Sequence, residues 1–197
     1  MIAGIDEAGR GPVIGPMVVC GVLFHSSDLE KLHRLGVRDS KAMSAQRRQQ
    51  LAPRILALAR KHEILEIEPR TIDRAREKKQ LNELEARVFA QIIQKLRPSE
   101  AFIDSADANP EKFKQRLQRY LRSPVHLIVE NFADQRYVQV AAASIVAKVV
   151  RDSRIAELRS VYGDFGSGYP ADPKTKKFLR EWLHKHGSFP DFVRKSW

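Results

Sequence analysis

The chain has 197 residues, a formal net charge of +11, a pI near 10.0 and 43% hydrophobic residues. This length suits one well-packed domain, and the ordinary apolar content excludes a disordered chain. The charge favours a polyanionic partner, with nucleic acid ahead of an acidic membrane. No apolar run is long enough for a membrane span, and Asp6, Glu7 and Arg10 interrupt the N-terminus before a signal peptide could form. We therefore expect a cytoplasmic monomer.

The first sixteen residues combine an apolar run, two adjacent carboxylates and a glycine-rich turn. Ile2 to Ile5 leads into Asp6 and Glu7, and the sequence Gly9-Arg10-Gly11-Pro12 then ends the strand. Met17 to Phe24 resumes strand character, which predicts a hairpin whose first strand ends in the two acids. Side chains alternate along a strand, so the two carboxylates point to opposite faces and at least one is buried.

Two interpretations of this turn compete. An isolated Asp-Glu pair is most simply a pair of turn residues, since Asp and Gly are common in turns. Here Arg10 between Gly9 and Gly11 brings backbone N–H groups and a guanidinium beside the acids, which favours an anion site next to a cation site. Gly15 completes an apparent dinucleotide fingerprint, but it stands one place late and a strand follows instead of a helix. We favour a metal site beside a phosphate site, as phosphodiester chemistry requires.

The next part of the chain is predicted to be mainly helical. Asp28 to Leu35 forms a short helix, and Ser44 caps a helix that runs to about His62. Glu63 to Glu68 alternates like an exposed strand. The charged run from Arg70 to Gln80 is interpreted as a solvated face in preference to a nucleic-acid contact. Leu81 to Leu96 has apolar residues at helical spacing and predicts an amphipathic helix.

Two further apolar runs lead to acids. Ala101 to Ile103 ends at Asp104, and Val125 to Glu130 ends shortly before Asp134, with a helix from Asn109 to about Tyr120 between them. Strands that alternate with helices after a hairpin predict an α/β sheet with parallel members, whose sites lie beyond the carboxyl ends of the strands. We therefore expect four carboxylates to converge there: Asp6, Glu7, Asp104 and Asp134.

A long helix is predicted from Val138 to Tyr162, and its apolar, small-residue first half must be buried. Ser144, Lys148 and Arg151 share one face of it, where they either pair with the acids, reach phosphate or form a solvent-facing stripe. A glycine-rich loop with Tyr169 follows, and then a basic helix. Tyr169 either packs in the core or, with its loop able to approach another backbone, packs on a sugar.

Several of these segments together resemble the type 2 ribonucleases H, usually called ribonuclease HII. The resemblance covers essentially the whole chain and rests on these segments: Gly4 to Pro12 (GIDEAGRGP), Arg38 to Lys41 (RDSK), Asp104, Ala133-Asp134, Ala142 to Asp152 (AASIVAKVVRD), Gly166 to Thr175 (GSGYPADPKT) and Phe192 to Trp197 (FVRKSW). The tyrosine loop and its Asp-Pro-Lys-Thr continuation are more archaeal or eukaryotic than bacterial in style. The short chain favours the archaeal, self-sufficient form.

The resemblance implies an α/β protein with a ribonuclease H-like fold, in which helices flank a five-stranded mixed sheet. It implies a single catalytic domain over residues 1–197 with a basic helical C-terminal segment from about residue 163. The implied activity is an endonuclease that hydrolyses the RNA strand of RNA/DNA hybrids and cuts 5′ of single ribonucleotides in duplex DNA. The implied products are a 3′-hydroxyl and a 5′-phosphate.

The resemblance also implies the site residues. Asp6, Glu7, Asp104 and Asp134 match the catalytic carboxylates that hold two Mg²⁺ or Mn²⁺ ions. The matched substrate-binding residues are Gly9, Arg10 and Gly11, which read the 2′-hydroxyl and its phosphate, Tyr169, which packs on the next sugar, and Lys41, Ser144 and Lys148, which contact phosphate or brace the acids.

Two features depart from the family pattern. A basic residue often stands shortly before the last catalytic aspartate, where this chain has Glu130-Asn-Phe132-Ala. Family members commonly continue past the Phe-Val-Arg-Lys-Ser-Trp segment with another helix, so a naturally short chain and a truncated one are both open. The sequence shows no sliding-clamp motif of the glutamine-then-aromatics type. Two other functions compete with a ribonuclease: a non-catalytic basic nucleic-acid-binding protein and a nuclease of the same fold that cuts DNA junctions.

Overall fold

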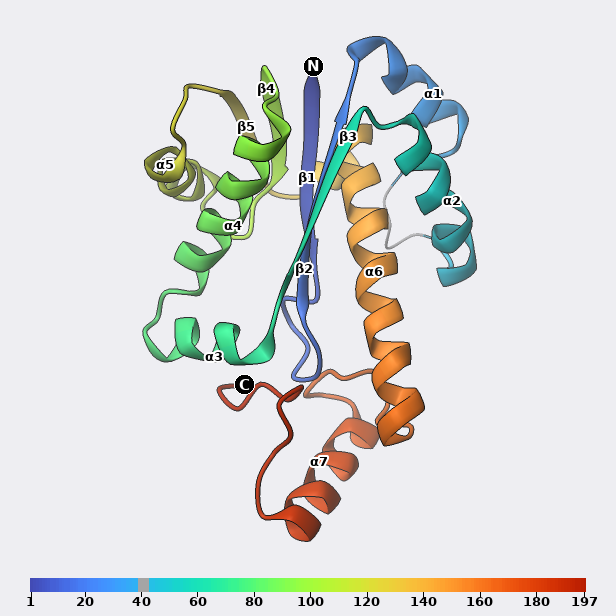
Figure 1. The fold of residues 1–197 in the computed structure, drawn as a ribbon, viewed down its shortest axis with the longest axis vertical. Helices are drawn as coiled ribbons and strands as arrows, with labels where there is room; N and C mark the ends of the chain where they lie inside the picture. Colours follow the sequence, from blue (N-terminus) through green and yellow to red (C-terminus); the bar gives the residue numbers. More distant parts are fainter. Residues whose placement is uncertain (39–42) are drawn as a thin grey trace.

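A five-stranded mixed sheet forms the centre of the molecule, with the strand order β3-β2-β1-β4-β5 (Figure 1). The structure is a computed structural model that describes residues 1–38 and 43–197. Its strands are β1 (Ile2–Ala8), β2 (Met17–Phe24), β3 (Lys61–Ile67), β4 (Glu100–Asp104) and β5 (His126–Glu130). β1 pairs with β2 as the predicted antiparallel hairpin, whereas β1, β4 and β5 are parallel. The mixed sheet expected from the sequence is confirmed.

Helices cover both faces of the sheet (Figure 1). On one side lie α1 (Leu29–Arg34), α2 (Ala45–Leu58) and α6 (Val138–Tyr162), and on the other lie α3 (Pro69–Glu77), α4 (Leu81–Leu96) and α5 (Pro110–Tyr120). Each side encloses its own apolar cluster against the sheet. The only cysteine, Cys20, is fully buried in the cluster beneath α6. None of the helices in the described part of the chain is long and apolar enough to cross a membrane.

The long helix α6 approaches the central strand β1 very closely. A Cβ atom placed on Gly4 would lie only 2.0 Å from the carbonyl oxygen of Gln139, so only glycine fits at this crossing. Ala141, Ala142 and Ala143 are buried next to this crossing, where their small side chains allow the helix to lie close to the sheet. This contact confirms the predicted burial of the first half of the helix, and it brings the following turn of α6 beside the carboxyl end of β1.

One local prediction is wrong and another holds with one exception. The helix capped by Ser44 ends at Leu58 and not near His62, because the chain already pairs with β2 from Lys61 onwards. The charged run from Arg70 to Gln80 is a solvated face as predicted, since every charged side chain in it except Asp73 is exposed. The carboxylate of Asp73 is buried there and accepts hydrogen bonds from the backbone N–H groups of Lys195 and Ser196.

The C-terminal part lies beyond the end of the sheet that holds the β1–β2 turn (Figure 1). Helix α7 (Pro173–His186) packs through a third apolar cluster, in which Ile14 of the turn meets Val193 near the C-terminus. Trp197 donates from Nε1 to the carbonyl oxygen of Gly11 at 2.9 Å. The C-terminal residues Val193 and Trp197 therefore pack against the glycine-rich turn and stabilise it.

Candidate active site

Three carboxylates meet at the carboxyl ends of β1 and β4. Asp6 and Glu7 are neighbours on β1, and Asp104 is the last residue of β4. Asp6 is turned towards α6, because the hydroxyl group of Ser144 donates a hydrogen bond to it. Glu7 is turned towards α4, where it lies near Glu85. The strand therefore separates the two acids onto opposite faces, as the alternation of side chains predicted.

Burial and repulsion from neighbouring acids make Asp6 and Glu7 hard to ionise. Burial raises the pKa of Asp6 well above its usual value, and the charges of Asp104 and Asp134 raise it further, against the hydrogen bond from Ser144. Burial also raises the pKa of Glu7, and Asp6 adds to the effect. Oε2 of Glu7 is buried and has no hydrogen-bond partner among the described residues. Such a cluster gains stability when a cation neutralises it.

Asp134 lies in the short helix η3 (Ala133–Gln135), next to Asp104. The backbone N–H of Ala133 donates to Oδ1 of Asp104 at 3.0 Å, which ties this helix to the end of β4. Asp134 is 2% exposed and close enough to Asp6 to raise its pKa, so all four predicted acids do converge. Asp134 itself, however, does not line the open cavity.

The site opens as a cavity of about 300 Å³. Its lining brings together most of the predicted residues, namely Asp6, Glu7, Gly9, Arg10, Gly11, Asp104, Ser144, Lys148 and Tyr169, and adds Ala8 and Arg48. A larger hollow of about 870 Å³, between the end of α4 and the α5–β5 connection, has no acid, histidine or cysteine in its lining. Within residues 1–38 and 43–197, no three Asp, Glu, His or Cys side chains are already arranged closely enough to hold a metal ion.

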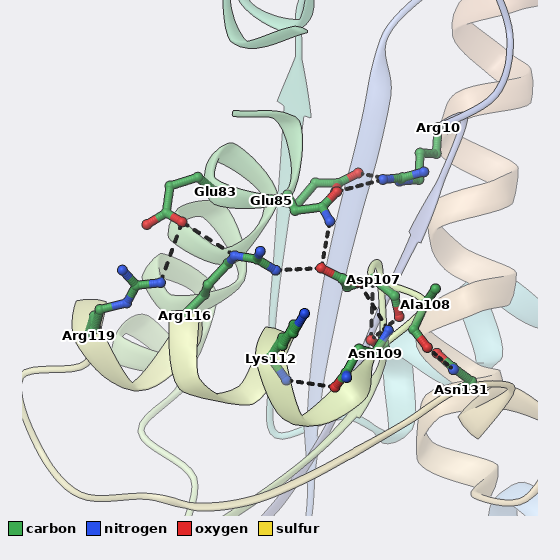
Figure 2. Close-up of polar contacts among 12 residues, drawn as sticks. Arg10, Glu83, Glu85, Asp107, Ala108, Asn109, Lys112, Arg116, Arg119 and Asn131 are labelled. Atoms are coloured by element: carbon green, nitrogen blue, oxygen red, sulfur yellow. Dashed lines mark hydrogen bonds and ion pairs between the residues drawn. The ribbon is translucent and has the colours of Figure 1, made fainter. Parts of the chain in front are cut away.

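The turn from Gly9 to Gly11 forms one wall of the cavity. Gly9 adopts a φ of +87°, which glycine reaches without strain. The Arg10 guanidinium lies near the acids, as the sequence predicted, since its charge acts on Glu7. It donates from Nε to Oε1 of Glu85 at 2.8 Å (Figure 2). It also donates from Nη2 to Asn82 at 2.8 Å. The guanidinium is therefore held by α4, while Gly9, Arg10 and Gly11 all line the cavity.

Arg194 supports the same turn from the C-terminal segment. Its side chain is 1% exposed, and its guanidinium donates to the carbonyl oxygens of Gly9, Arg10 and Gly15 at 2.6 to 3.1 Å. These carbonyl oxygens belong to the loop between β1 and β2, whose N–H groups at Val13, Ile14 and Gly15 bond to other segments. The buried guanidinium therefore satisfies the backbone of the loop and fixes its path.

Cationic side chains line the wall of the cavity formed by α2 and α6. Lys148 donates from Nζ to Asp152 at 2.9 Å, and Arg151 donates to the same carboxylate at 3.2 Å. Arg48 of α2 lies 3.8 Å from Asp152 and also lines the cavity. Ser144 and Arg151 are buried, which excludes the solvent-facing stripe considered for this helix face.

Tyr169 projects from the glycine-rich loop at the mouth of the cavity. Its ring is 44% exposed, so it does not fill the core. A Cβ atom on Gly11 would lie 3.3 Å from the ring, and the Arg151 guanidinium lies 6.0 Å from the ring centroid. The hydroxyphenyl ring therefore lies against the turn, with part of its surface open to a ligand.

The family comparison agrees with this arrangement, since the ribonuclease HII family model matches residues 3–197. The chain belongs to the ribonuclease HII family. Ribonuclease HII from Methanothrix thermoacetophila is 43% identical over 198 residues, covering 100% of this chain and 94% of the relative. Ribonuclease HII from Pyrococcus furiosus is 45% identical over 198 residues, covering 100% and 88%. Membership of this family identifies a nuclease of the ribonuclease H type.

Solved structures of the ribonuclease HII family show the same fold. The crystal structure of ribonuclease H2 from Pyrococcus horikoshii superposes with a TM-score of 0.93 at 40% identity, covering 100% of this chain and 93% of that chain. Ribonuclease HII from Archaeoglobus fulgidus, solved in complex with PCNA, gives a TM-score of 0.91 at 43% identity with the same coverage. The expected ribonuclease H-like fold is confirmed.

Sequence reasoning missed three residues of this ribonuclease HII site, and the predicted Lys41 lies outside the described residues. Glu85 had a usable signal, because it lies four residues from both Leu81 and Phe89 and so shares the apolar face of α4. Arg194 stands within the Phe-Val-Arg-Lys-Ser-Trp segment, but nothing in that segment indicates its contacts. Arg48 has no sequence signal that separates it from other helical arginines.

Proposed function

We propose that this ribonuclease HII family member hydrolyses the RNA strand of RNA/DNA hybrids and cuts 5′ of single ribonucleotides in duplex DNA. The observation that supports the proposal is that Asp6, Glu7 and Asp104 line the same cavity as the Gly9–Gly11 turn. A phosphodiester held by the turn would lie against the carboxylates. The products expected from such a site are a 3′-hydroxyl and a 5′-phosphate.

We assign Asp6, Glu7, Asp104 and Asp134 as the residues that hold two divalent cations. The donors are carboxylate oxygens, which suit Mg²⁺ or Mn²⁺ better than thiophilic metals. The raised pKa values of Asp6 and Glu7 and the unpartnered buried Oε2 of Glu7 fit a site that is stabilised by positive charge. When bound, such ions activate a water molecule and stabilise the negative charge on the leaving oxygen.

The remaining residues of the cavity bind and orient the substrate. Backbone N–H groups of Gly9 to Gly11 bind the 2′-hydroxyl and its phosphate, since the Arg10 side chain is directed to α4. Tyr169 packs on the sugar of the next nucleotide. Lys148 and Arg48 attract the phosphate backbone from the opposite wall. Ser144 orients Asp6 through its hydrogen bond.

The direct test is cleavage of a labelled DNA duplex that carries one ribonucleotide, with Mg²⁺, Mn²⁺ or EDTA. We expect metal-dependent cleavage immediately 5′ of the ribonucleotide, and no cleavage of an all-DNA duplex. Asp104→Asn should abolish it, whereas Asp191→Asn should not, because Asp191 pairs with Arg70 on the surface. Binding without cleavage in every metal would instead support a non-catalytic nucleic-acid-binding protein, and cleavage of the all-DNA duplex would support a DNA nuclease.

A further inference from the structure

Glu85 is a fully buried carboxylate on the sheet-facing side of α4, with a side chain that is 0% exposed. A buried carboxylate is costly unless it is paired. Its partner is Arg10, which donates to Oε1 at 2.8 Å and to Oε2 at 3.4 Å (Figure 2). Glu85 itself does not line the cavity. A residue outside the cavity therefore holds the side chain at the centre of the proposed ribose-reading turn.

A second contact fixes the same guanidinium. Asn82, almost one helical turn before Glu85, accepts from Nη2 of Arg10 at 2.8 Å and donates to Asp107 at 2.6 Å. Asp107 also pairs with Arg116 of α5 (Figure 2). Asp107 lies three residues after Asp104, in the loop that follows β4. The network thus connects the turn after β1 to the loop that begins at a second predicted metal ligand.

The pairing of Arg10 with Glu85 also affects the neighbouring carboxylate of Glu7. Arg10 is close enough to Glu7 to act on its carboxylate electrostatically, while Glu7 keeps a buried oxygen without a hydrogen-bond partner among the described residues. Without Glu85, the Arg10 guanidinium would be attracted mainly by Glu7, whose charge acts on it more strongly than that of Asp107. It would then distort the turn and occupy an oxygen that the proposed cation needs.

We propose that Glu85 is a positioning residue, which holds Arg10 against α4 and thereby fixes the Gly9–Gly11 backbone in the conformation that distinguishes ribose from deoxyribose. This inference rests on the proposed function, because it explains what fixes the turn to which that function assigns the reading of the ribose. It places a determinant of specificity on α4, outside the cavity. Glu85 acts through Arg10 and contacts no reacting atom.

The test is a binding measurement without turnover. Wild-type protein and Glu85→Ala are titrated in EDTA with a duplex that carries one ribonucleotide and with the matching all-DNA duplex. We expect Glu85→Ala to lower the ratio of the two affinities about tenfold, which corresponds to about 1.4 kcal/mol. Glu83→Ala is the matched control, because Glu83 is on the same helix but contacts Arg116, Arg119 and Tyr120 instead of Arg10. An unchanged ratio in Glu85→Ala would overturn the proposal.

Glu85→Gln keeps the test decisive if the alanine variant does not fold. The amide oxygen can still accept from Nε of Arg10, so we expect an affinity ratio between those of wild type and Glu85→Ala, with a melting temperature near that of wild type. A ratio equal to that of wild type in a folded Glu85→Gln, together with a loss limited to melting temperature in Glu85→Ala, would indicate a merely structural role. If wild type itself fails to prefer the ribonucleotide duplex, the proposed function fails and not this inference alone.

Discussion

Arg194 donates a hydrogen bond from Nη2 to the carbonyl oxygen of Gly9 at 2.6 Å, which joins residues 185 positions apart in the chain. The same guanidinium also reaches the carbonyl oxygens of Arg10 and Gly15. The proposed ribose-reading turn is thus held by its backbone from the C-terminal segment and by its side chain from α4. Glu85 and Arg194 are buried, whereas the Arg10 side chain is 41% exposed, so the contact of Arg194 is the more protected of the two.

We expect Arg194→Lys to lower the free energy of unfolding by about 3 kcal/mol. Lysine keeps the charge but cannot reach the several carbonyl oxygens that the planar guanidinium satisfies. Thermal unfolding measures the change, and the ribonucleotide preference in EDTA should fall with it. The neighbouring Lys195→Ala is the control, since the Lys195 side chain is exposed. Equal stability of wild type and Arg194→Lys would show that the backbone of the turn is held by other contacts.

Asp6→Asn should separate stability from activity. Loss of a proposed metal ligand should lower cleavage by more than about a hundredfold, because even outer partners of metal ligands cost about 10- to 100-fold when mutated. In EDTA the same variant should melt at a higher temperature than wild type, since the amide removes repulsion with Asp104 and Asp134 while still accepting from Glu7 N–H. A variant that cleaves at near wild-type rates would contradict the assignment of the carboxylates.

The stability gained by Asp6→Asn should depend on pH. The pKa of Asp6 is raised above its ordinary value of 3.8, so the folded protein takes up a proton that the unfolded chain releases. This contribution stabilises wild type at pH values below about 3.8 and is lost as pH rises through the folded pKa. The difference in melting temperature between Asp6→Asn and wild type in EDTA should therefore grow with pH, and a constant difference would contradict the raised pKa.

Tyr169→Ala should reduce cleavage at a lone ribonucleotide about tenfold, by the loss of a packing contact on the neighbouring sugar, and should reduce cleavage within a long RNA/DNA hybrid less. Its melting temperature should change little, because the ring is 44% exposed. Tyr162→Ala provides the contrast, since Tyr162 packs against Trp182 and Phe192 and its loss should lower the melting temperature. Equal losses on both substrates with a lowered melting temperature in Tyr169→Ala would identify a packing residue.

Affinity for duplex should fall steeply as salt rises. A chain of net charge +11 that neutralises phosphates releases condensed counterions, with about −0.9 in the log–log slope per contacted phosphate. Lys148→Ala should make the slope shallower by about 0.9, because Lys148 lines the cavity. Lys31→Ala should not change it, because Lys31 lies on α1 and does not line the cavity. A flat plot for wild type would mean that the charge does not serve substrate binding.

Sequence patterns over a few neighbouring residues are sufficient to predict much of the secondary structure. The period of two along β1 placed Asp6 and Glu7 on opposite faces, and the continuous run of small apolar residues predicted α6 from Val138 to Tyr162. The N-caps at Ser44 and Asn109 are also predictable from local sequence, because each side-chain oxygen accepts a hydrogen bond from the backbone N–H three residues later. These features depend on neighbours a few residues apart, so the sequence alone carries them.

Tertiary structure decided the features that depend on partners distant in the chain. The pairing of β3 with β2 ended α2 at Leu58, against a helical pattern that continued further. The burial of Glu85 fixed the Arg10 guanidinium against α4, because a buried carboxylate requires a cation and its partner lay 75 residues earlier. Arg194 bound the turn only because the apolar cluster around Val193 carries the C-terminal segment beneath it. No local pattern encodes which long-range partner satisfies a buried charge.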